Sequence, residues 1–215
     1  IMRMYVGYAN RRVPIDTSGM NPTVAAETRL FFVRRTLLWD MPSQHAEVEA
    51  AAATNNGVVM EPTALSEAYK VYMPNDPGLN ASAACLYMIV ALAHPRELEH
   101  FSADEIGRIP VGSGYLPVFV DAWGNPIRFL RWPVQFPDSD VQPPPNVVPG
   151  DAGFVRDPFD TRGVDTAAKR LPLIYSAGPD ARFGIDPTTG APVGSSDDEY
   201  RTHYDNIHNH RLEIR

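Results

Sequence analysis

Apolar residues recur at helical spacing in the first half of the chain. After Asn21-Pro22-Thr23, which can cap a helix, the pattern predicts an amphipathic helix over residues 23–40. The residues expected on its buried face are Leu30, Phe31, Val33, Leu37 and Leu38, with Arg29, Arg34 and Arg35 facing outward. Met41-Pro42-Ser43 would end this helix and cap an alanine-rich one that runs to about residue 53, where Asn55-Asn56-Gly57 is a stop signal.

Two further helices are expected over residues 63–72 and 81–93. The second contains the longest apolar run of the chain and should form the core helix. This run is shorter than the roughly 18 apolar residues that a membrane span requires. Cys85 lies within it, so we expect a small buried hydrophobic residue rather than a reactive thiol. With one cysteine, the chain cannot form an internal disulfide.

From residue 110 onward, the pattern changes to short strands separated by turns. Residues 115–120, 127–132, 171–176 and 208–214 predict four strands. Residues 121–126 form a turn cluster that would connect the first two strands in a hairpin-like way, with Trp123 folded beneath it.

Helices followed by strands, without β-α-β alternation, predict an α+β fold in which N-terminal helices pack on a small antiparallel β-sheet. The chain would then comprise a leading segment (1–22), a helical region (23–110) and a sheet region with an acidic loop (111–215). The proline-rich residues 133–170 would form a long surface loop within the sheet region.

The charge balance narrows the range of partners. The chain has 26 acidic and 19 basic residues, which gives a net charge of −7 at pH 7. Affinity for nucleic acid depends on clustered Lys and Arg side chains that release counterions from phosphates. We therefore expect no nucleic acid among the partners.

The sequence contains no recognisable nucleophilic site. Gly112-Ser113-Gly114 lacks the glycine spacing of the G-x-S-x-G turn, and Cys85 has no histidine near it. We therefore expect a protein that is not an enzyme. The enzymatic alternative is a metal-dependent hydrolase that uses His208, His210 and an acidic residue of the loop within residues 176–200. If residues 207–214 form a strand, His208 and His210 share a face about 7 Å apart, which suits two zinc ligands, and His203 is close by.

An acidic loop separates the last two predicted strands. Within residues 176–200 it contains Asp180, Asp186, Asp197, Asp198 and Glu199, against one basic residue, Arg182. Calcium takes six to eight oxygen ligands, and a glycine-containing acidic loop can wrap around the ion to supply them. The loop is therefore a candidate calcium site, although it lacks the residue order of an EF-hand. The structural alternative is an acidic turn that is simply solvated.

Two segments of the second half form a recognisable pair. Residues 121–126 read D-x-W-G-x-P, and residues 173–180 read LIYSAGPD immediately before the acidic loop. This pair resembles the C-terminal region of the major pseudopilins of type II secretion and of related prepilin-type proteins with a cleaved, methylated N-terminus. The resemblance covers mainly residues 115–215.

The resemblance implies a non-enzymatic structural subunit with a pilin-like head. Such subunits are anchored in the bacterial inner membrane by an N-terminal helix, with the head in the periplasm, and assemble into filaments. Other pilin-like subunits and components of the secretion machinery would be the partners. Carried over by position, the implied calcium ligands are the carbonyl of Ser176 and the carboxylates of Asp180, Asp197 and Asp198.

The sequence departs from the family pattern in three places. The family's G-F-T-L-x-E start and its apolar span are absent from the chain, which begins at Ile1, and we expect an anchor upstream of that residue. The acidic loop is longer than in the family, and the segment 133–170 is additional. Besides the hydrolase, a third possibility is a calcium-dependent module that binds carbohydrate or protein through exposed Trp132 or Tyr115.

Overall fold

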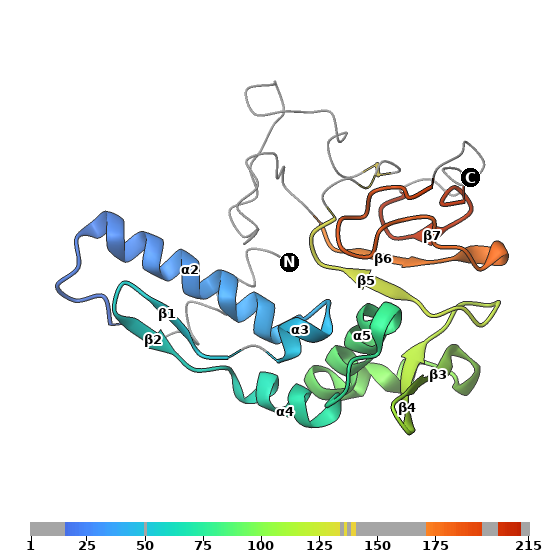
Figure 1. Ribbon diagram of the computed structural model, residues 1–215, viewed down its shortest axis with the longest axis horizontal. Helices are drawn as coiled ribbons and strands as arrows, with labels where there is room; N and C mark the ends of the chain where they lie inside the picture. Colours follow the sequence, from blue (N-terminus) through green and yellow to red (C-terminus); the bar gives the residue numbers. More distant parts are fainter. Residues whose placement is uncertain are drawn as a thin grey trace.

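The protein combines helices with three small antiparallel sheets, which confirms the α+β class (Figure 1). The computed structural model describes residues 16–49, 51–133, 136, 139–140, 171–194 and 202–211. The α-helices are α2 (Pro22–Asp40), α3 (His45–Val48), α4 (Ala64–Tyr72) and α5 (Ala81–Ala93). The strands are β1 (Ala53–Asn55), β2 (Val58–Met60), β3 (Ile106–Val111), β4 (Gly114–Phe119), β5 (Arg128–Leu130), β6 (Leu173–Ser176) and β7 (Ile207–His208).

Helix α2 begins as expected but buries a different face. The Asn21 side chain accepts a hydrogen bond from the Thr23 amide at 2.9 Å, and Pro22 occupies the first turn. The buried side chains are Ala25, Thr28, Phe32, Val33, Thr36, Trp39 and Asp40, whereas Leu30, Phe31, Leu37 and Leu38 are only half-buried. Arg29 is exposed, and Arg34 and Arg35 are half-buried. The expected face was therefore wrong, because apolar residues surround this helix and its packing partners select the side that is buried.

Those packing partners include a β-hairpin where the sequence predicted an alanine-rich helix. After the single turn of α3, the chain forms β1 and β2, which pair antiparallel through Asn55 and Val58. Asn56 and Gly57, with φ of 48° and 78°, form the two-residue turn. Positive φ at both turn residues favours Asn-Gly, so the dipeptide taken as a helix stop is a hairpin turn. The hairpin lies along α2, and the two project together from the rest of the fold (Figure 1).

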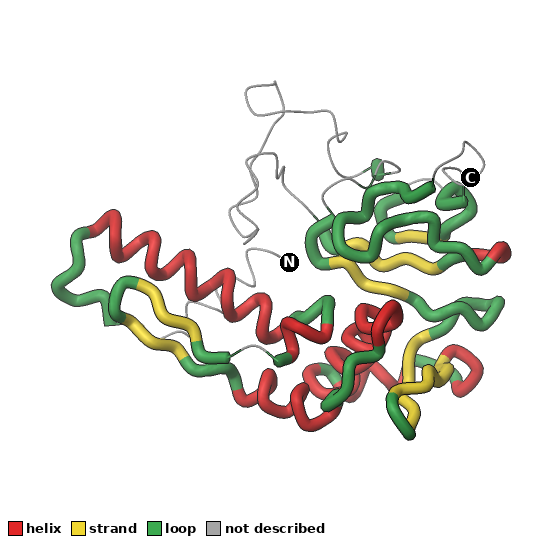
Figure 2. The backbone as a smooth tube through the Cα atoms, in the orientation of Figure 1, coloured by secondary structure: helices red, strands yellow, loops and turns green. Residues whose placement is uncertain are grey.

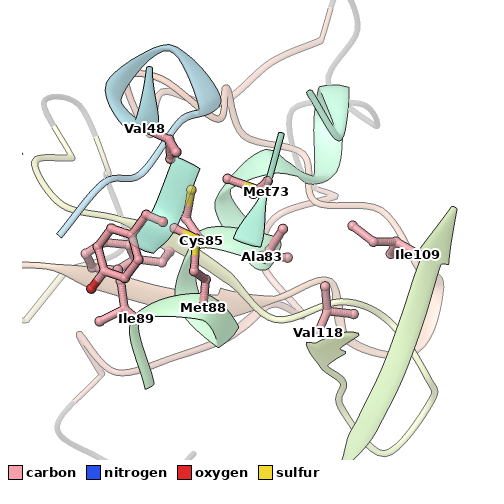
Figure 3. Packing of buried hydrophobic residues seen from close by; sticks show 11 residues of the cluster. Val48, Met73, Ala83, Cys85, Met88, Ile89, Ile109 and Val118 are labelled. Carbon is pink, nitrogen blue, oxygen red and sulfur yellow. The ribbon is translucent and has the colours of Figure 1, made fainter. Parts of the chain in front are cut away.

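The two other predicted helices are confirmed. Thr63 caps α4 by accepting a hydrogen bond from the Ser66 amide at 3.1 Å. Helix α5 lies at the centre of the main core, where Ala83, Cys85 and Met88 are fully buried. Side chains from α3, α4, β3 and β4 pack around it (Figure 3). Burial raises the pKa of the Cys85 thiol, in agreement with the inert role expected for it.

The strands pair differently from the expected order. β4 pairs with β3, which begins at Ile106 inside the region expected to be helical, and not with β5. β5 belongs to a three-stranded sheet with the order β5-β6-β7 (Figure 2). The turn at residues 121–126 therefore passes the chain from one sheet to the next, with one isolated bridge between Val120 and Pro126.

The three-stranded sheet separates two cores. Phe129 on β5 belongs to the main core around α5, whereas Leu130, Leu173 and Tyr175 form a second core with Ile185 and Phe136. Of the last predicted strand, residues 208–214, His208 lies in β7 and pairs with Tyr175 of β6. Residues 209–211 form a turn and loop instead, so the shared strand face expected for His208 and His210 is wrong, and residues 212–215 lie outside the described residues. Most of the proline-rich segment also lies outside them. Among the residues that the structure describes, no helix is both long enough and apolar enough to span a bilayer.

Candidate calcium loop and the turn that supports it

The turn at residues 121–126 is organised by one carboxylate. Asp121 Oδ1 accepts hydrogen bonds from the amides of Trp123 (2.9 Å) and Asn125 (2.8 Å), and its Oδ2 accepts from Asn125 Nδ2 at 3.2 Å. Gly124 has φ of 86°, a conformation that glycine adopts without strain. The D-x-W-G-x-P segment is thus a self-bonded turn. Trp123 is 52% exposed rather than folded beneath it, which corrects the expectation for this side chain.

This turn holds the second segment of the pair. Asn125 Nδ2 donates a hydrogen bond to the carbonyl of Gly178 at 2.7 Å, across 53 residues of sequence. Gly178 has φ of 68°, and a Cβ at this position would lie 2.5 Å from the carbonyl oxygen of Asp205. Residues 121–126, Gly178 and Asp205 therefore meet at one point, and a residue with a side chain does not fit at Gly178.

The structure describes two of the four implied calcium ligands. Ser176 is the last residue of β6 and is buried, and its hydroxyl oxygen makes no hydrogen bond. Asp180 ends the short 3₁₀ helix Gly178–Asp180, is exposed, and accepts a hydrogen bond from the Arg182 amide at 2.7 Å through Oδ1. Asp197 and Asp198 lie outside the described residues.

The residues present supply part of a calcium site. The carbonyl of Ser176 and the carboxylate of Asp180 are hard oxygen donors, as calcium requires, but six to eight such ligands are needed. Within the described ranges, no group of three or more His, Cys, Asp or Glu side chains could hold a metal ion. A complete site at this loop would therefore need at least about four more oxygen ligands, from Asp197 and Asp198, from backbone carbonyls or from water.

Asp186, in the same acidic loop, is engaged by its own turn. Its Oδ1 accepts hydrogen bonds from the Thr188 amide (2.9 Å), the Thr189 amide (2.7 Å) and the Thr189 hydroxyl (2.9 Å). Partial burial disfavours the charged form, but these hydrogen bonds outweigh it and lower the pKa of Asp186. This carboxylate stabilises the loop locally.

His203, His208 and His210 of the hydrolase alternative are buried, and His210 is hydrogen-bonded through both ring nitrogens. His210 Nε2 donates to the Pro172 carbonyl at 3.1 Å, which leaves Nδ1 to accept from the Ser139 hydroxyl at 3.0 Å. Burial lowers the pKa of His210, so the neutral ring is favoured. The His208 ring packs edge-on against Phe136 at 4.8 Å between ring centres. Zinc coordination by His210 would require breaking one of its two hydrogen bonds.

The aromatic residues of the binding-module alternative differ in exposure. Tyr115 is 70% exposed, as expected, but Trp132 is buried, with the Arg131 guanidinium 4.2 Å from its ring. Trp132 was therefore wrongly expected at the surface and cannot offer its ring face to a sugar.

A cavity of about 220 Å³, which the sequence analysis did not predict, lies among residues 43–46, 76–82 and 187–188. Its polar lining includes His45, whose Nε2 donates to the Met73 carbonyl at 3.2 Å, and the exposed carboxylate of Asp76. Gln44 Nε2 donates to Thr188 Oγ1 at 3.3 Å, which connects two of its walls. The volume lies below the roughly 300 Å³ at which sites for drug-sized ligands begin. No local pattern marks this cavity because it is formed by three segments far apart in the chain.

Comparison with protein-family models, curated proteins and solved structures finds no match to this chain. The resemblance to pseudopilins therefore depends on the paired segments themselves and on their contact.

Proposed function

We propose that this chain is the head of a non-enzymatic structural subunit that resembles a pseudopilin and assembles with other pilin-like subunits at the bacterial cell envelope. The observation that carries the proposal is the hydrogen bond between Asn125 and the Gly178 carbonyl. The two segments on which the resemblance depends are neighbours in space, although 53 residues separate the bonded pair. Their contact is what a shared structural unit requires, whereas two chance matches need not meet.

The calcium loop has a structural role in this proposal. An ion bound by Ser176, Asp180, Asp197 and Asp198 would join the end of β6 to the loop that leads to β7. Binding to the folded state alone stabilises that state by mass action, so the order of the loop would follow the calcium concentration. The same proposal includes a pilin-like fold for the head and an N-terminal helix that anchors it in the membrane.

Two physical considerations explain how a subunit of this kind would assemble into a filament. A helix with more apolar surface than its own head covers must bury the excess in lipid or against neighbouring helices. A head-to-tail contact whose rotation does not close a ring produces an open helical assembly. A subunit of this kind needs no active site.

The test uses the natural gene product, including any residues encoded before Ile1. We expect a stretch of about 20 apolar residues upstream, recovery of the protein in the inner-membrane fraction, and a ladder of oligomers after chemical cross-linking in cells. Asn125→Ala should reduce the ladder, while Asn75→Ala, an exposed asparagine of another loop, should leave it unchanged. A gene product without such a stretch that stays monomeric in the soluble fraction would contradict the proposal.

A further inference from the structure

The tip of the β1-β2 hairpin contains the one Asn-Gly dipeptide of the sequence, Asn56-Gly57. Both residues are exposed, and a Cβ at Gly57 would have no atom within 4 Å. The absence of a side chain at Gly57 and the open space around it leave its backbone nitrogen accessible. Asn-Gly is the sequence in which such a nitrogen meets least steric obstruction from its own residue.

The side-chain amide of Asn56 is held by the neighbouring helix. Asn56 Nδ2 donates hydrogen bonds to Thr28 Oγ1 at 2.8 Å and to Asn55 Oδ1 at 3.0 Å. Thr28 is fully buried on α2, so its hydroxyl is a fixed acceptor. These bonds use both N–H groups of the Asn56 amide, and the one to Thr28 attaches the tip of the hairpin to α2.

We propose that Asn56 is a site of spontaneous deamidation and that Thr28 controls its rate. In this reaction, the Gly57 backbone nitrogen attacks Cγ of Asn56, and a C–N bond forms to give a five-membered succinimide. The Cγ–Nδ2 bond breaks, and Nδ2 leaves as ammonia with the proton that Gly57 nitrogen loses. Water then opens the ring at one of its two carbonyls, which yields aspartate or isoaspartate. No oxidant, enzyme or cofactor is needed.

Thr28 restrains the group that must move. The attack requires the Asn56 carboxamide to turn its Cγ toward Gly57 nitrogen, and the bond to Thr28 Oγ1 holds the amide toward α2 instead. Breaking that hydrogen bond precedes ring closure. A net hydrogen-bond contribution of about 1 kcal/mol corresponds to a factor of about 5 in rate.

Deamidation would also weaken the attachment of the hairpin. The product carboxylate has no N–H to donate, so the hydrogen bond to Asn55 Oδ1 would be lost, and the contact with α2 would remain only if the Thr28 hydroxyl turned to donate to the carboxylate. Isoaspartate would add one carbon to the backbone inside a two-residue turn whose length sets the register of β1 and β2. The hairpin that lies along α2 would therefore loosen once the reaction has occurred.

The test follows deamidation by peptide mass spectrometry and by isoaspartate labelling during incubation of the folded protein at mildly alkaline pH. The variants are Thr28→Val, which removes the acceptor and keeps the shape, Thr28→Ser, which keeps the hydroxyl, and Thr36→Val. Thr36 is a matched control because it is also buried on α2, where its hydroxyl donates to the Phe32 carbonyl at 2.9 Å.

We expect deamidation at Asn56, a rate about 5-fold higher in Thr28→Val, and wild-type rates in Thr28→Ser and Thr36→Val. Equal rates in all four proteins would overturn control by Thr28. Equal acceleration in Thr28→Val and Thr36→Val would also overturn it, because general destabilisation of α2 would then be the cause. Absence of deamidation at Asn56 in the folded wild type at this mildly alkaline pH would overturn the site itself.

Discussion

Gly178 shows how one residue without a side chain can bring distant segments together. Its positive φ and the nearby Asp205 carbonyl leave no room for a Cβ, and its own carbonyl accepts the hydrogen bond from Asn125. Gly124 is a useful comparison, since it has φ of 86° but no atom within 4 Å of a built Cβ. Alanine substitutions at these two glycines therefore distinguish the cost of backbone strain alone from the cost of strain combined with a steric clash.

We predict that Gly178→Ala destabilises the protein more than Gly124→Ala does. Alanine at Gly124 meets only the left-handed conformation, which costs about 1–2 kcal/mol. Alanine at Gly178 adds a collision with the Asp205 backbone, so we expect a loss of about 3 kcal/mol, at the upper end of ordinary substitutions. Urea denaturation of the two variants and the wild type measures both losses. Equal losses of unfolding free energy in the two variants would show that the loop around Asp205 moves at little cost to accommodate the added Cβ.

At the scale of elements, hydrophobic periodicity determined where helices lie better than which side of them is buried. α4 and α5 were predictable because capping and turn residues bound each apolar run. Helix α2 has apolar residues on all sides, so its pattern did not indicate which face is buried. Contacts with the hairpin and α4 determine that face. β3 was missed because Gly107 and Pro110 interrupt its apolar pattern, although both are accommodated in a strand with one partner.

The candidate site was predictable only as a set of residue types. The sequence indicated the acidic loop and the D-x-W-G-x-P turn, each from local chemistry. It did not reveal that Asn125 reaches Gly178, because that contact depends on how two sheets are joined. The burial of Trp132 likewise depends on tertiary packing, and no local pattern distinguishes it from exposed Trp123.

We predict that calcium raises the melting temperature of the wild type and that Asp180→Asn and Asp197→Ala reduce this gain. Calcium at 100 times its dissociation constant stabilises a folded protein by about 2.7 kcal/mol, and about 2–4 °C is expected per kcal/mol for a chain of this size. With chelator present, all variants should melt at similar temperatures, because the loop then has no ion to lose.

Scanning calorimetry with and without calcium measures these differences. Glu61→Gln is the matched control, since it removes one exposed carboxylate from a different segment of the chain. Identical melting of the wild type with calcium and with chelator would contradict the calcium site and leave the assembly proposal to its own test.

At the scale of the whole molecule, an ion pair between a buried arginine and a half-buried glutamate joins the sheet to the helices. The Arg131 guanidinium, next to β5, binds Glu47 of α3 at 2.5 Å and also donates to the Met41 carbonyl at the end of α2. Glu47 in turn accepts from the amide and hydroxyl of Ser43. Removing the arginine would leave the half-buried Glu47 carboxylate without a counter-charge.

We predict that Arg131→Met alone lowers the free energy of unfolding by about 3 kcal/mol, because it leaves the Glu47 carboxylate without a counter-charge. Arg131→Met combined with Glu47→Gln should recover most of that loss, because the neutral amide needs no counter-charge. Chemical denaturation of the wild type, the two single variants and the double variant measures the four free energies of unfolding that make up a double-mutant cycle. A double variant no more stable than Arg131→Met would mean that the arginine acts chiefly through Met41 and through its packing on Trp132.

The burial of Cys85 has a practical consequence for studies of assembly. Its thiol is the one thiol of the chain, is fully enclosed beside Met88, and resists ionisation. A cysteine introduced at an exposed position such as Tyr115 would therefore be the group that maleimide dyes and spin labels modify in the native protein. Distances between subunits could then be measured by fluorescence transfer or electron resonance without first replacing a core residue.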